Sequence, residues 1–196
     1  MQFRAARQWS SLDAELEMLK EENGGVVPIH EYVPISQHIS HNSLTTEGVI
    51  QQIDFLTGNA SNTGWAIYTA PFSSDTTPSR TWNGDWGAAV GGLATEFTAY
   101  DAATRPALVF PAAAATDATV QTSGVTASDA FIVSAGTSDT TLYGMVLTNN
   151  NTKQYDAGSA ICLAASRYAD NQRPIWSAGL SYALQYIASA PSLLAA

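Results

Sequence analysis

A chain of 196 residues with 45% hydrophobic side chains is long and apolar enough to bury a core, which excludes a wholly disordered protein. Only 13% of its residues are charged, about half the soluble average of roughly 25%, and the formal net charge is −9. Because the eight basic residues are scattered rather than clustered, we expect no nucleic acid and no anionic membrane surface among its partners.

The first element that the sequence predicts is a short helix, for which Ser10 and Ser11 are candidate N-caps. Asn23-Gly24-Gly25 supplies its C-terminal stop. One narrow apolar stripe follows the i, i+4, i+7 spacing and consists of Leu12, Leu16 and Leu19. So short a helix is marginal alone in water, so we expect it to dock on its own β domain or on a neighbouring subunit.

An extended arm is predicted next, over residues 26–41, because Pro28 and Pro34 disfavour both a helix and a central strand. Its apolar residues have little to bury against one another, and we expect them to lie along the surface of another protein or subunit: Val27, Ile29, Tyr32, Val33 and Ile35. Residues 1–47 therefore form one predicted region, the N-terminal helix and arm. Its histidines, His30, His38 and His41, lack the cysteines or carboxylates that would complete a metal shell, and no metal site is predicted.

Residues 48–196 predict an all-β domain of the β-sandwich or jelly-roll kind. Short segments rich in strand formers alternate with Gly, Asn and Asp turns such as Asn83-Gly84. Ala112–Ala115, which follows Pro111, is predicted as a loop or short strand. The predicted strands are residues 64–69, 95–100, 130–134, 142–148, 159–165 and 180–188.

No catalytic residues and no cofactor are predicted. The carboxylates Asp85, Glu96 and Asp101 lie in an aromatic-rich stretch where a pair of acids would suit a glycan site, but acids of this domain occur singly and mostly within turns. All histidines precede the β domain, and neither a Gly-x-Ser-x-Gly elbow nor a phosphate-binding loop occurs. We therefore expect a protein that is not an enzyme.

Two aromatic residues leave an alternative open. Trp82 and Trp86 either pack in the core or form an exposed patch, which would be a sugar platform or a subunit interface. The one cysteine, Cys162, lies in an apolar run and is expected to be buried. No apolar run is long enough to span a membrane and no secretory signal is recognised at residues 1–9, so a cytosol-like compartment is expected.

Three segments resemble a recurring set in small virion-associated proteins of tailed bacteriophages. They are residues 95–108, which begin Thr-Glu-Phe-Thr-Ala-Tyr-Asp, residues 141–153, which begin Thr-Leu-Tyr-Gly-Met-Val-Leu-Thr, and Ala164–Tyr168, with Trp65–Tyr68 as a loose match to the first strand of that group. The resemblance covers roughly residues 60–188 and implies a β module among head and tail structural proteins, with no catalytic residues to carry over.

The expected function is therefore a capsid decoration (cement) protein that binds the major capsid protein on the virion surface after assembly in the bacterial host cytoplasm. An arm and a β domain suit a symmetric shell, and a homotrimer is expected. Two alternatives remain open at this point. The chain could be another virion component, such as a head fibre, neck or tail protein, or it could be a carbohydrate-binding β module.

Overall fold

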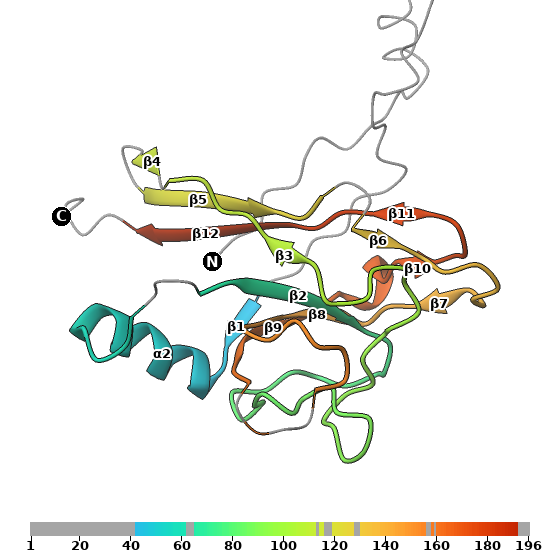
Figure 1. Ribbon diagram of the computed structural model, residues 1–196, viewed down its shortest axis with the longest axis horizontal. Coiled ribbons are helices and arrows are strands. Elements are labelled where there is room, and N and C mark those ends of the chain that lie inside the picture. Colours follow the sequence, from blue (N-terminus) through green and yellow to red (C-terminus); the bar gives the residue numbers. More distant parts are fainter. Residues whose placement is uncertain are drawn as a thin grey trace, which may run out of the picture. The chain divides into compact units, whose positions relative to one another are not determined.

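The computed structural model describes residues 42–61, 65–112, 114–115, 119–127, 130–155, 158 and 160–191 (Figure 1). All of them belong to a compact unit that includes Ser40–Ala196. Strands predominate in this part of the chain, arranged in several small antiparallel sheets with one α-helix. The β-rich prediction is therefore confirmed. The predicted N-terminal helix and arm lie outside the described residues.

A five-stranded sheet forms the centre of the unit, in the order β1-β9-β8-β2-β3. All of its pairings are antiparallel, and Val146 in the middle strand lies opposite Ala70 on one side and Ala165 on the other. The strands are β1 (Asn42–Leu44), β9 (Cys162–Arg167), β8 (Gly144–Thr148), β2 (Ile67–Phe72) and β3 (Ala107–Leu108).

Smaller sheets cover one face of this central sheet. In Figure 1 the sheet β12-β5-β4 and the pair β11-β6 run above β2 and β8. The remaining pair is β10-β7. The strands are β4 (Ala114–Ala115), β5 (Thr119–Val125), β6 (Phe131–Ile132), β7 (Thr140–Thr141), β10 (Ile175–Trp176), β11 (Ser181–Tyr182) and β12 (Gln185–Pro191), and a 3-10 turn, η1, spans Asp170–Gln172.

The core lies on both faces of the central sheet, because alternate residues of a strand point to opposite sides. Val146 packs with Phe72 and the tryptophans of the loop after β2. Its neighbour Met145 packs with Phe131 and Trp176, which belong to the smaller sheets. Both faces are thus covered, which explains why β8 is buried along its whole length.

Helix α2 (Thr46–Thr57) was not predicted. Thr45 caps its N-terminus by accepting a hydrogen bond from the Gly48 N–H at 3.0 Å, and Gly58 ends it in a left-handed conformation with φ of 76°. A Cβ on Gly48 would stand 2.0 Å from the Leu163 carbonyl oxygen, so the helix touches β9 where only glycine fits. The domain boundary predicted at residue 47 falls inside this helix, so residues 42–47 belong to the β unit.

Most predicted strands overlap observed ones: residues 64–69 with β2, 130–134 with β6, 142–148 with β8, 159–165 with β9 and 180–188 with β11 and β12. Ala114–Ala115 is a short strand, as expected. The prediction over residues 95–100 is wrong. This segment makes isolated bridges at its two ends, from Glu96 to Phe72 and from Tyr100 to Val133, because it crosses from the central sheet to the layer above.

Candidate functional site

Trp82 and Trp86 are buried, so of the two placements left open by the sequence the core is correct and the exposed aromatic patch is wrong. Their exposed fractions are 4% and 0%, and their rings stack with centroids 6.1 Å apart. Both pack against Phe72 of the central sheet. The Asn83-Gly84 turn between them lies so close to the chain that a Cβ on Gly84 would stand 2.0 Å from the Ala160 carbonyl oxygen. The pair is part of the core and offers no sugar platform.

Glu96 and Arg105 form a buried ion pair beside Trp86. Arg105 donates from Nε to Glu96 Oε1 at 2.8 Å and from Nη2 to Oε2 at 2.7 Å, and both side chains are 0% exposed. The guanidinium carbon lies 5.5 Å from the centroid of the Trp86 ring. This two-point geometry is the strongest form of an arginine–carboxylate contact.

The buried ion pair also fixes the loop of residues 149–154. Arg105 donates from Nη1 to the Asn150 carbonyl at 3.1 Å, and its backbone N–H donates to the Asn151 carbonyl at 2.7 Å. The Gln154 N–H donates to Glu96 Oε2 at 2.6 Å, although Gln154 has an unfavourable positive φ of 51°. The loop is therefore held from both ends by one ion pair.

Lys153, in the same loop, is bound as well. Its Nζ donates to the carbonyls of Thr98 and Tyr100 at 3.1 and 2.8 Å, and it lies 3.6 Å from the centre of the Tyr100 ring. Partial burial lowers the pKa of Lys153, while the charges of Glu96 and Asp101 oppose that shift. Its contacts join the loop to the segment that follows Glu96.

The three acids considered for glycan chemistry have separate roles. Both oxygens of Glu96 accept hydrogen bonds within the buried ion pair and its loop. Asp101 accepts from the Ser134 hydroxyl at 2.7 Å. At Asp85 the backbone N–H donates to the Asn83 side chain at 3.3 Å, as in an Asx turn, while its carboxylate oxygen Oδ1 is buried with no hydrogen-bond partner among the described residues. Glu96 and Asp101 thus hydrogen-bond to different partners, Arg105 and the Gln154 N–H for Glu96 and Ser134 for Asp101.

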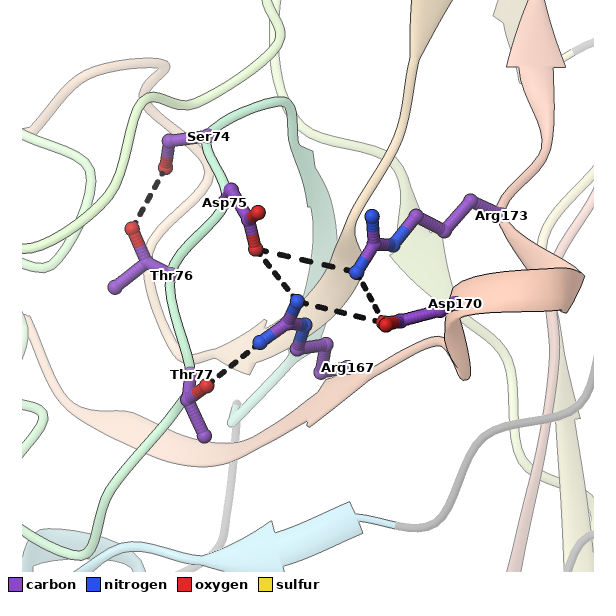
Figure 2. A network of polar contacts seen from close by, with 7 residues as sticks. All are labelled: Ser74, Asp75, Thr76, Thr77, Arg167, Asp170 and Arg173. Atoms are coloured by element: carbon purple, nitrogen blue, oxygen red, sulfur yellow. Dashed lines mark hydrogen bonds and ion pairs between the residues drawn. The ribbon is translucent and has the colours of Figure 1, made fainter.

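A second polar network lies nearer the surface and joins the loop after β2 to the end of β9 and to η1 (Figure 2). Arg167 of β9 donates to Asp75 at 2.5 Å and to the Thr77 hydroxyl at 2.7 Å. Arg173 pairs with Asp170 and lies 4.4 Å from the centre of the Tyr143 ring. Because each arginine reaches both carboxylates within 4 Å, the charges cancel locally. The network holds the loop after β2 against η1.

The outer side of α2 carries exposed aliphatic side chains. Ile50, Ile53 and Leu56 are 54%, 51% and 87% exposed, while the opposite side of the helix contacts β9 at Gly48. Large apolar side chains clustered on one element usually mark a contact surface, whereas single ones are ordinary. We call Val49, Ile50, Ile53 and Leu56 the α2 face.

The remaining predicted residues divide in two groups. Cys162 is fully buried, as expected, and burial raises its pKa to about 12. The contact residues predicted in the helix and arm lie outside the described residues: Leu12, Leu16, Leu19, Val27, Ile29, Tyr32, Val33 and Ile35. Within the described ranges no group of three or more His, Cys, Asp or Glu side chains could hold a metal ion, and no helix is long and apolar enough to cross a membrane.

Sequence reasoning missed the α2 face and the buried ion pair. The signals for the helix were Thr45, a good N-cap residue, and Gly58, a good stop.

Comparisons of the chain with protein-family models, with curated proteins and with solved structures found no match.

Proposed function

We propose that this chain is a non-enzymatic structural protein of a tailed-phage particle, a decoration (cement) protein that binds the major capsid protein and stabilises the head. The observation that carries the proposal is the α2 face. Aliphatic side chains exposed on a firmly held helix suit binding to another protein rather than chemistry on a small molecule.

The polar residues of the β unit support the same function. Glu96, Arg105 and Lys153 are engaged in holding loops together, and Cys162 is buried with a raised pKa. Because these ionisable side chains hold the β unit together, the unit suits a structural role in a capsid shell. The resemblance of residues 60–188 to virion-associated proteins of tailed phages supplies the phage assignment.

We also propose that the two layers of strands form a β-sandwich of the jelly-roll kind. On a capsid, copies arranged around local three-fold axes would form trimers, and many weak contacts on one lattice would give lasting attachment.

The test is the location and number of copies in purified particles. We expect hundreds of copies on the head, and heads without the protein should lose their DNA at lower temperature or denaturant concentration. A few to a few tens of copies would instead indicate a neck, tail or fibre component. Absence of the chain from particles would refute a virion role.

A further inference from the structure

We infer that the α2 face binds in an apolar groove of a different protein, and that the rim of this groove carries Lys or Arg side chains. The inference rests on the proposed function, in which that protein is the major capsid protein. It adds the contact helix, the binding mode and the chemistry of the partner surface.

The first support is that α2 is held in place before it binds anything. The Thr46 N–H donates to the Arg80 carbonyl at 2.8 Å, and Glu47 accepts from the Cys162 N–H at 2.9 Å. At the other end, the rings of Phe55 and Trp65 make an edge-to-face contact with their centroids 4.9 Å apart. A helix fixed at both ends loses little conformational freedom on binding, which favours affinity.

The second support is the spacing of the apolar residues. Val49, Ile53 and Leu56 follow i, i+4, i+7, and Ile50 widens the stripe by one position. These are the anchor positions of a helix that lays its apolar side in a groove. The exposed Gln52, four residues before Leu56, lies at the edge of the stripe, and the exposed Thr57 lies at its C-terminal end, so the contact has polar neighbours.

The third support is charge, which decides between possible occupants. Helix α2 contains two acidic residues and no basic one, and Asp54 is adjacent to Ile50 on the helix surface because it lies four residues later. The whole chain carries a net charge of −9. A second copy on the α2 face would bring like charges together, and an anionic membrane would repel it. A basic rim on a different protein complements the helix.

The experiment uses the full-length protein and, as its probe, purified heads that lack this chain. Binding is measured for two matched pairs of variants. Ile53→Ser removes an apolar anchor that is 51% exposed, whereas Ile175→Ser removes the same side chain, 58% exposed, from β10. Gln52→Lys and Gln52→Glu place opposite charges beside the stripe and leave its four aliphatic side chains unchanged.

We expect Ile53→Ser to weaken binding about tenfold or more and Ile175→Ser to bind like the wild type. Gln52→Lys should bind more weakly than Gln52→Glu at 0.05 M salt, and the difference should vanish near 1 M salt, where the Debye length is about 3 Å. Circular dichroism and thermal melting confirm that each variant is folded.

Several results would overturn the inference. If wild-type protein binds heads and Ile53→Ser binds equally well, another surface makes the contact, and the proposed function stands without this helix. If Gln52→Lys binds more tightly than Gln52→Glu, the rim is acidic. If sedimentation shows a wild-type oligomer that Ile53→Ser dissociates, the occupant is a second copy. If wild-type protein does not bind heads at all, the proposed function fails and the inference fails with it.

Discussion

The buried ion pair gives the sharpest test of how the β unit is held together. Glu96→Gln keeps the size of the side chain and removes its charge. The carboxylate accepts two hydrogen bonds from Arg105 and one from the Gln154 N–H. A glutamine offers one oxygen and one NH2 group, so in either orientation a donor faces a donor and the Arg105 charge stays buried without a counter-charge.

The expected loss is about 3–5 kcal/mol, the range for removing one partner of a buried pair. Solvent does not reduce this figure, because both side chains are fully buried. A typical domain has a free energy of unfolding of about 5–15 kcal/mol, so the loss is a large part of the total. With a denaturant slope of about 2 kcal/mol per M, the urea midpoint should fall by about 2 M.

Urea unfolding followed by tryptophan fluorescence measures this loss, because Trp86 lies in the core beside Arg105. Asp101→Asn is the matched control. It also neutralises an acid, but an exposed one whose side chain accepts a hydrogen bond from the Ser134 hydroxyl, and it should cost less than about 1 kcal/mol. If Glu96→Gln lowers the midpoint no more than Asp101→Asn, the buried ion pair does not stabilise the fold as argued.

Three further predictions concern glycine contacts and titration. Gly48→Ala forces α2 away from the Leu163 carbonyl, so its Tm should be well below that of the control Gly58→Ala. A Cβ on Gly58 meets open space, and only the φ of +76° costs about 1–2 kcal/mol. Equal Tm values for the two variants would contradict the close contact at Gly48. Because burial raises the pKa of Cys162 to about 12, a thiol reagent at pH 8 should label the protein only when urea unfolds it, and rapid labelling of the folded chain would refute its burial. Burial raises the pKa of both Tyr100 and Tyr168, and the Glu96 charge raises that of Tyr100 further, so the folded state keeps protons that the unfolded chain releases near pH 10. Stability should therefore fall as pH rises above about 10, and phenolate absorbance from all tyrosines near pH 10 in a folded sample would contradict this.

Much of the strand content was predictable because it depends on local pattern. The alternation of apolar and polar residues around β2 and the apolar run of β9 indicated directly that these segments are strands. Helix α2 was missed because Val49, Ile50 and Ile53 are β-branched and favour strands when judged one by one. Its caps and its contact with β9 outweigh those preferences.

The contacts of the candidate site were not predictable because they join distant segments. Glu96 and Arg105 are nine positions apart in a stretch with no regular element, and only the folded chain brings their side chains together with the 149–154 loop. The position of Trp82 and Trp86 likewise depends on the sheet beneath them. The residue type alone is compatible with either a surface or a core position for these two tryptophans.

The start of the β unit has a mechanical consequence. Three successive residues bind two distant segments: the Thr45 N–H donates to Leu163, the Thr46 N–H donates to Arg80, and Glu47 accepts from Cys162. A pulling force applied through the chain before Asn42 would reach these three bonds and the β1–β9 pairing before it reached the core. Tension on the N-terminal side should therefore break these three hydrogen bonds and the β1–β9 pairing first. The other strands of the central sheet should stay paired until then.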